Sequence, residues 1–404
     1  MEYIVFAIPF FFLLIVIEWL VDWRRGTQFC QIGDAITSLN AGVISRINQV
    51  FRAFIPFTVY FLIVDSVSIV EWPNHWITWV VAFVVYDFCY YWHHRMGHEI
   101  NLLWAAHVVH HSSEEYNLTT ALRQTSGSFI GFIFYLPLAF LGIPGDILIA
   151  VASLNLLYQF WVHTRHIPKL GWYEWLFVTP SNHRVHHAIN QVYIDKNYGG
   201  VFILWDRLFG TFQEELKEEP CLYGVRKPLH SWNPIWANLQ VYWQLIKDAW
   251  HTQSYKDKLL IWFKPTGWRP KDVEQSMPLA KFNPDTFEKF KNELSLAVSV
   301  YLLAQQLGLL TLTFLYLQQL THFSTLQTLL WGSGIVFSTW MLSLIIREQQ
   351  SVVVNEILRL GLINLLLWTL SDSMILNAVA SLWSIISVLM TLVVQPKPQL
   401  KVIE

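Results

Sequence analysis

The sequence predicts an all-α, polytopic membrane protein with about nine transmembrane helices, on three observations. Of its 404 residues, 54% are hydrophobic and 14% charged, with a mean hydropathy of +0.36, which is too apolar for an ordinary soluble domain. Apolar runs of the roughly twenty residues that cross a bilayer as a helix recur along the chain. Lysine and arginine gather in alternate segments between these runs, as the positive-inside rule requires.

Each predicted span is an apolar run bounded by polar or turn-forming residues. The nine runs are 2–21, 51–70, 77–92, 128–142, 147–163, 294–320, 326–346, 357–370 and 374–394. The first run begins with acidic Glu2 and has no small-residue cleavage site before Arg24, so we expect a retained span rather than a signal peptide. Residues 143–146 (IPGD) join the fourth and fifth runs, which indicates a tight or partly re-entrant hairpin.

The basic residues fix the expected orientation. With the N-terminus outside, the inside segments are 22–50, 93–127, 164–293, 347–356 and the tail after 394. Arg52 and Arg359 then lie at the cytoplasmic ends of their spans, whereas the outside turn 71–74 has no basic residue. The membrane is expected to be the cytoplasmic membrane in a bacterium or the endoplasmic reticulum in a eukaryote.

Three histidine groups fall in the inside segments. They are His94-x-x-x-His98, His107-x-x-His110-His111 and His183-x-x-His186-His187. Residues three and four apart on a helix share a face, so each group can direct two or three imidazoles at one point. This spacing predicts a metal site at the cytoplasmic face of the membrane.

The remaining composition excludes other classes of site. The net charge of -2 provides no polybasic surface for nucleic acid. The three cysteines, Cys30, Cys89 and Cys221, are far apart in the sequence, which predicts neither a disulfide framework nor a zinc knuckle.

The number of histidines indicates two metal ions. Eight imidazoles exceed the three or four protein ligands of a zinc site, and imidazole also suits iron, so a dinuclear iron site is the economical interpretation. A site at the bilayer surface can receive a lipid from the membrane, which favours oxidation of a lipid C–H bond by O₂. A metal-binding or metal-transporting membrane protein is the non-enzymatic alternative, although transport sites lie near the bilayer midplane.

An acidic residue inside the third span is expected to support the site. Asp87, Tyr91, His94 and His98 recur at intervals of four, three and four, so they share one helical stripe. We predict that Asp87 accepts the free ring N–H of a ligand histidine. A hydrogen bond that only packs helices is the alternative.

The other histidines have separate interpretations. His163 ends the fifth span and is either a ninth ligand or an anchoring residue. His93 lies about 100° from His94 around a helix and is expected to point away from the site, and His166 is expected in a loop or interface. The isolated histidines are interpreted as structural: His75, His230, His251 and His322.

These features divide the chain into three regions. Residues 1–212 form the expected membrane-embedded catalytic region, 213–292 a cytosolic cap or linker, and 293–404 the C-terminal transmembrane helices, to which we assign no chemistry. Several tryptophans of the middle region suit amphipathic helices at the headgroup level, with a packed linker as the alternative. They are Trp232, Trp236, Trp243, Trp250, Trp262 and Trp268.

The triple histidine motif resembles the fatty acid hydroxylase superfamily, the membrane-bound di-iron group that includes sterol desaturases. Three longer segments resemble its ether-lipid-cleaving members. They are YWHHRMGHEINLLWAAHVVHHSSEEYNLTTALRQ, QFWVHTRHIPKLGWYEWL and TPSNHRVHHAINQVYIDKNYGGVFILWDRLFGTF. The chain departs from that pattern at His93, where the family usually has an aromatic residue, and at the basic, histidine-bearing segment 164–166.

The resemblance implies a monooxygenase that uses O₂ to hydroxylate the ether-linked carbon of alkylglycerols, with tetrahydrobiopterin as reductant. It associates Glu99, which follows the first histidine pair, with the pterin; a solvated carboxylate is the alternative. The competing enzymatic interpretation is a sterol or fatty-acyl hydroxylase or desaturase that takes electrons from an electron-transfer protein. The segments 195–199 and 205–212 also match the superfamily and are interpreted as scaffold.

Overall fold

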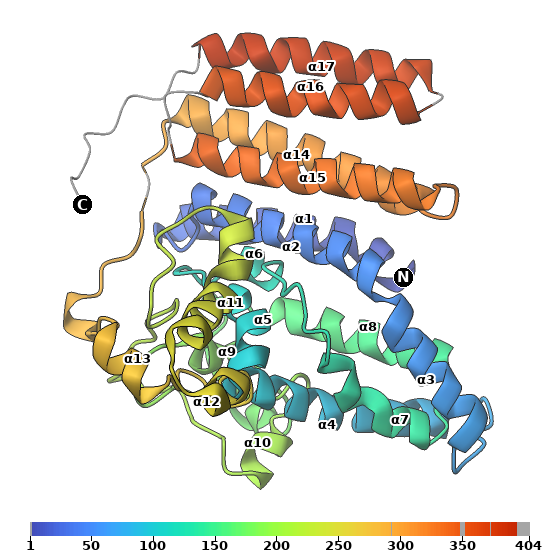
Figure 1. Ribbon diagram of the computed structural model, residues 1–404, viewed down its shortest axis with the longest axis vertical. Helices are drawn as coiled ribbons and strands as arrows, with labels where there is room; N and C mark the ends of the chain where they lie inside the picture. The colour runs from blue at the N-terminus through green and yellow to red at the C-terminus, as the bar shows by residue number, and fades with distance from the viewer. Residues whose placement is uncertain (1, 292, 348–351, 372, 394–404) are drawn as a thin grey trace.

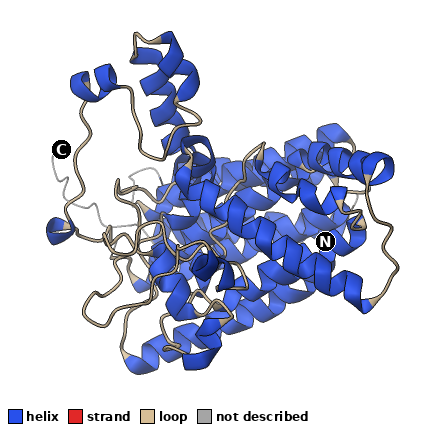
Figure 2. Cartoon of the chain, turned by 90° about the horizontal axis from the view of Figure 1, so that it is seen from below, coloured by secondary structure: helices blue, strands red, loops and turns tan. Residues whose placement is uncertain are grey.

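The computed structural model describes residues 2–291, 293–347, 352–371 and 373–393, and within these ranges every regular element is a helix. Figures 1 and 2 show helices joined by loops, with only three isolated β-bridges in the described chain. The prediction of an all-α fold is therefore confirmed.

Four helices in the described part of the chain are long and apolar enough to cross a membrane. They are α14 (Leu296–Gln319), α15 (Thr325–Ile346), α16 (Val352–Leu370) and α17 (Met374–Val393). A fifth span is counted if α2 (Ile32–Arg52) and α3 (Phe54–Val67), bent by 50° at their junction, act as one. The chain is a helical membrane protein, but the count of nine spans is not supported.

The remaining expected spans form helices that are shorter, broken or less apolar. The run 128–142 divides into η1 (Gly131–Tyr135) and α7 (Leu136–Phe140), and the run 147–163 gives the 17-residue α8 (Gly145–Trp161). The runs 2–21 and 77–92 lie in α1 (Glu2–Arg25) and α4 (Trp76–Glu99), which end in charged residues and histidines. Apolar runs identify buried helices as well as spans, so their number overestimates crossings. Residue 394 of the last expected span lies outside the described residues.

The helices form stacked layers. In Figure 1, the pair α16 and α17 lies beside α14 and α15, which lie beside α1 and α2. One apolar cluster joins α2 to these C-terminal helices, with Ile36, Tyr301 and Ile335 almost fully buried in it. The C-terminal helices therefore pack directly against the N-terminal part of the chain.

The histidine-bearing helices occupy the other side of α1 and α2. Helix α4 packs against α8 and against α5 (Asn101–His111), and α9 (Pro180–His187) completes the group. The middle region contains α11 (Pro234–His251), α12 (Tyr255–Leu260) and α13 (Lys271–Ser276), of which α11 packs on both α5 and α2. The shorter helices are α6 (Leu118–Ala121), η2 (Gly171–Trp175), α10 (Leu204–Leu208) and η3 (Pro284–Thr286).

Candidate metal centre

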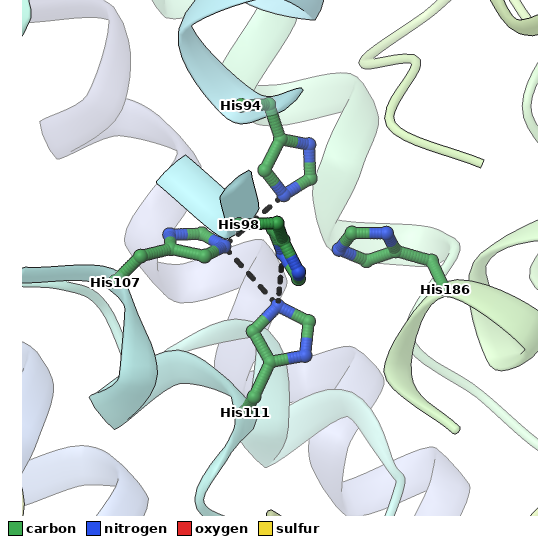
Figure 3. Close-up of side chains that lie close together, drawn as sticks. All are labelled: His94, His98, His107, His111 and His186. Atoms are coloured by element: carbon green, nitrogen blue, oxygen red, sulfur yellow. Dashed lines mark hydrogen bonds between the residues drawn. The ribbon is translucent and has the colours of Figure 1, made fainter. Parts of the chain in front are cut away.

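Nine histidines gather in two adjacent clusters, and the potential ligand atoms of each cluster all lie within 4.8 Å of one another. Cluster one, drawn in Figure 3, consists of His94, His98, His107, His111 and His186. Cluster two consists of His110, His163, His183 and His187. The structure thus brings together all eight histidines of the three motifs and adds His163, for which the sequence left two interpretations open.

Local helix signals hold the third motif in place. Thr179 caps α9: it forms a capping box with Asn182, and Pro180 occupies the first turn, where a missing N–H has no cost. All residues of α9 are buried. The short helix therefore presents its three histidines to the interior.

Neighbouring histidines in the sequence belong to different clusters. His110 joins cluster two and His111 joins cluster one, whereas His186 joins cluster one and His187 joins cluster two. Consecutive residues on a helix point about 100° apart, so each His-His pair divides between two points. The rings of His111 and His187 stack with centroids 4.3 Å apart, which places the clusters side by side. Each of these two motifs still directs two imidazoles at one point, as expected, and gives its third histidine to the other cluster.

Backbone carbonyls orient four of the rings through Nδ1. The pairs are His94 with Tyr198 (2.8 Å), His186 with Lys196 (2.9 Å), His110 with Arg123 (3.0 Å) and His163 with Gln159 (2.8 Å). A carbonyl oxygen can only accept, so Nδ1 carries the hydrogen and the Nε2 lone pair is free in the neutral ring. Such partners fix the tautomer of metal-binding histidines.

Two inward nitrogens, those of His110 and His163, face each other without a hydrogen to share. Nε2 of His163 lies 3.4 Å from Nε2 of His110 and 3.1 Å from Nε2 of His183. Because His110 and His163 both donate from Nδ1, two lone pairs meet. Burial lowers the pKa of His110 to about 4, so a ring proton does not relieve this contact near neutral pH. A metal cation bound between the two rings would relieve it, because both lone pairs would then bind the metal.

The spacing of the nitrogens agrees with ligation. Three Nε2 contacts of 3.1 Å connect His94, His98, His107 and His111 in cluster one, as the dashed lines in Figure 3 mark. Ligands about 2.0–2.1 Å from one metal ion lie roughly 3 Å apart when adjacent. Nε2 of His186 and His187 and Nδ1 of His183 are buried without a hydrogen-bond partner in the described structure, which is unusual for buried polar atoms.

The residues therefore fit two metal ions. Five imidazoles exceed the tetrahedral set that zinc takes in structural sites, and an all-nitrogen donor set suits iron among the first-row metals. Burial also lowers the pKa of His183 and His187 well below the ordinary value, which keeps these rings neutral and able to bind a metal.

Asp87 does not contact a histidine. Its carboxylate is fully buried and accepts four hydrogen bonds. The donors are Asn155 Nδ2, Val201 N, Phe202 N and Trp205 Nε1, at 2.6–3.0 Å. The prediction that Asp87 accepts a ring N–H of a ligand histidine is wrong, because the loop before α10 occupies both of its oxygens.

Asp206 supports the site instead, and the sequence did not single it out. Its carboxylate accepts from Tyr198 N at 2.7 Å, Gly199 N at 2.8 Å and Thr211 Oγ1 at 2.7 Å. The carbonyl of Tyr198 is the acceptor for His94 Nδ1. Burial raises the pKa of Asp206 to about 6. The available signal was an acidic residue inside the aromatic segment 205–212, which we interpreted only as scaffold.

Asn197 shapes the same loop. It has a positive φ of 56° and donates to the carbonyls of Asn182 and Gln213 at 3.0 and 2.8 Å. Asp195, also at positive φ, has Oδ1 3.7 Å from His98 Nδ1. The turn therefore returns the chain beneath cluster one, and asparagine and aspartate are suited to its positive φ angles.

A buried ion pair supports cluster two. Arg123 donates to Asp34 Oδ1 at 2.6 Å and to Ser112 and Ser38 at 3.1 and 3.0 Å, and its own carbonyl accepts from His110. This role could not be predicted from the sequence, because every residue has a carbonyl.

The other predicted residues lie at the edge of the site or outside it. Glu99 is 36% exposed and accepts from Arg95 Nε at 2.8 Å. His93 contacts the hydroxyl of Tyr135 at 3.2 Å and stacks on Phe134, so it points away from the clusters, as expected. His166 lies near Asp22, at an interface with α1.

Comparisons with known proteins agree with the histidine pattern. Residues 79–211 match the fatty acid hydroxylase family model. The chain is 43% identical over 273 residues to alkylglycerol monooxygenase from Homo sapiens, covering 67% of this chain and 60% of the relative. It is 41% identical over 280 residues to alkylglycerol monooxygenase from Xenopus tropicalis, covering 69% and 62%.

A more distant relative is the ornithine lipid hydroxylase OlsE from Rhizobium tropici, 30% identical over 162 residues, covering 38% of this chain and 48% of the relative. No solved structure gives a significant match. The aligned part of the chain spans about 60% of the length of the alkylglycerol monooxygenases. The resemblance indicated by the motifs is confirmed: residues 79–211 match the fatty acid hydroxylase family, and the chain is similar to alkylglycerol monooxygenases over about two thirds of its length.

Proposed function

We propose that this chain is a membrane-bound, O₂-dependent di-iron monooxygenase that hydroxylates a lipid C–H bond, with the ether-linked carbon of alkylglycerols as its target. The observation that carries this proposal is the pair of adjacent all-histidine clusters in a chain related to alkylglycerol monooxygenases. Two bound irons would supply the activation of O₂ and the oxidation of the C–H bond.

The chain's own residues would hold and orient the metals. His94, His98, His107, His111 and His186 are the proposed ligands of one iron, and His110, His163, His183 and His187 those of the other. The backbone carbonyls behind His94, His110, His163 and His186 keep the Nε2 lone pairs directed inward. The all-imidazole set leaves both ions with neutral ligands.

The lipid substrate would come from the bilayer itself. The distribution of basic residues supports a site at the cytoplasmic face, in the cytoplasmic membrane of a bacterium or the endoplasmic reticulum of a eukaryote. In this proposal residues 1–212 are catalytic, 213–292 form a cap, and 293–404 anchor the chain.

Tetrahydrobiopterin is the proposed reductant, and Glu99 its contact. Glu99 directly follows the ligand His98, and its half-exposed carboxylate remains accessible beside Arg95. A reduced pterin of another kind or an electron-transfer protein would take the same place in the reaction. We assign Asp87 to the scaffold rather than to catalysis.

Aldehyde release from an alkylglycerol, measured in membranes that contain the protein with and without tetrahydrobiopterin, tests this function. The expected result is pterin-dependent aldehyde, lost in a His98→Ala variant. A second candidate, supported by the similarity to OlsE and to the fatty acid hydroxylase vlmA from a Lecanicillium species, is a hydroxylase of acyl chains or sterols. Hydroxylated lipid without aldehyde, from membranes with two irons per chain, would favour this candidate.

A further inference from the structure

Helix α11 presents an apolar stripe that no described part of the chain covers. Five large side chains at intervals of three and four residues are exposed by 38–80% of their surface. They are Trp236, Leu239, Trp243, Ile246 and Trp250. This is one face of a helix, and the opposite face is buried through Ala237, Leu245 and Asp248.

The stripe continues into the next helix. Tyr255, Leu259 and Phe263, at spacings of four residues in and just after α12, are exposed by 85%, 72% and 64%. Eight large apolar or aromatic side chains in 28 residues form a continuous pattern of a kind that marks an interaction surface. We call these eight exposed side chains the α11–α12 face.

Four lysines surround this face, against one partly exposed aspartate of α12, Asp257. Lys247 and Lys256 are exposed, Lys258 donates to the carbonyl of Trp250 at 3.2 Å, and Lys264 lies over the ring of Trp268. The acidic Asp248 is buried and paired with Arg269 at 2.6 Å, so it does not offset them at the surface. Tryptophan flanked by lysine is the composition of helices that lie in a membrane surface.

The buried side of α11 and the segment around Ile261 contact the beginning of α5, the helix that carries His107, His110 and His111. Leu245 and Ile261 form a cluster with Ala105 of α5, two residues before His107. Asn101, the first residue of α5, donates to the carbonyls of Ile261 and Trp268 at 2.9 and 3.1 Å and accepts from Gly267 N at 2.9 Å.

We propose that the α11–α12 face lies in the headgroup region of a membrane leaflet that contains anionic phospholipid, and that it fixes the position of α5 relative to that surface. The apolar stripe enters the acyl boundary, and the lysines meet phosphate groups. The middle region is then a membrane-surface element that connects lipid contact to the helix carrying His107, His110 and His111.

Photocrosslinking in the full chain tests this inference. Benzoylphenylalanine is placed at Trp243, at Trp250 and, as a control, at exposed Glu218, and the protein is reconstituted in phosphatidylcholine vesicles with or without phosphatidylglycerol. Mass spectrometry then identifies the adducts. Lipid adducts several-fold more abundant at Trp243 and Trp250 than at Glu218, and reduced without phosphatidylglycerol, are expected.

Two outcomes would overturn the inference. Lipid adducts at the two tryptophans no more frequent than at Glu218, or protein adducts in their place, would exclude a membrane-bound face. Equal yields with and without phosphatidylglycerol would exclude the anionic leaflet. None of the three positions lies in α14 to α17, so we expect every variant to insert. No turnover is measured, so these results are independent of the proposed reaction.

Discussion

Replacing Asp206 by asparagine should weaken metal binding in cluster one without touching a ligand. Asp206 holds the backbone N–H groups of Tyr198 and Gly199, and the carbonyl of Tyr198 holds His94 Nδ1. An asparagine keeps the size of the side chain but turns one acceptor oxygen into an NH₂ group. That NH₂ then faces an N–H donor in a site that is fully buried.

The magnitude follows from these contacts. A buried donor left without an acceptor costs about 1–3 kcal/mol, and the loop can relieve this only by moving the Tyr198 carbonyl. Loss of such an outer partner of a metal-binding histidine typically reduces metal affinity about 10- to 100-fold, or about 1.4–2.7 kcal/mol. The cost of the unpaired donor and the loss of metal-binding free energy agree in size, so we expect most of that cost to reduce metal binding through His94.

Iron retention during titration with a chelator, followed by elemental analysis, measures the change. Asp87→Asn is the matched control, because Asp87 is also a fully buried carboxylate that binds the same loop, through Val201 and Phe202, but contacts no histidine. We expect the control to lose thermal stability while its iron affinity stays near native. Native affinity in Asp206→Asn, or an equal loss in both variants, would refute this reasoning.

Three further predictions concern the ligands and the edge of the site. His163→Ala should leave cluster two with three donors and reduce the iron content to about one per chain, whereas His166→Ala should keep both irons; full iron content in His163→Ala would remove it from the ligands. The metal-depleted protein should lose thermal stability as the pH falls from about 6.5 toward 4, because burial lowers the pKa of His110 to about 4 and the unfolded chain takes up the proton first. Equal melting temperatures at both ends of that interval would contradict this. Glu99→Gln should raise the tetrahydrobiopterin concentration needed for half-maximal turnover while iron content is unchanged, and an unaltered pterin dependence would count against a role for Glu99.

The fold class could be predicted from composition, but the number of spans could not. Hydropathy recognises apolar helices without distinguishing a lipid-facing helix from a buried one. The run 128–142 shows the difficulty: it is apolar throughout, yet it changes from a 3₁₀ helix to an α-helix near Pro137. The four C-terminal runs lie in helices that are both long and apolar enough to cross a membrane, whereas α1 and α4 are as long but end in charged residues and histidines.

The candidate ligands could be found from spacing, whereas their supports could not. The three motifs gave eight histidines, but the histidine three residues from His163 is His166, which lies outside both clusters, and only the fold brings His163 to His183. The supports of His94, His110, His163 and His186 are backbone carbonyls, which have no sequence signal. The spacing correctly placed Asp87 on the same side of α4 as His94, but it did not show that the two residues are too far apart to contact. They are seven residues apart, which is about 10 Å along the helix axis.

The division of adjacent histidines between clusters makes the two metal sites mechanically dependent. Helix α5 supplies ligands to both clusters, and so does α9. A shift of either helix therefore changes both donor sets together, and the stacked rings of His111 and His187 resist sliding between them. The buried side of α11 and the segment around Ile261 pack on Ala105 and Asn101 of α5. Binding of the α11–α12 face to the membrane would therefore affect the position of both donor sets. Lipid contact and the geometry of the metal centre would then be coupled through one helix.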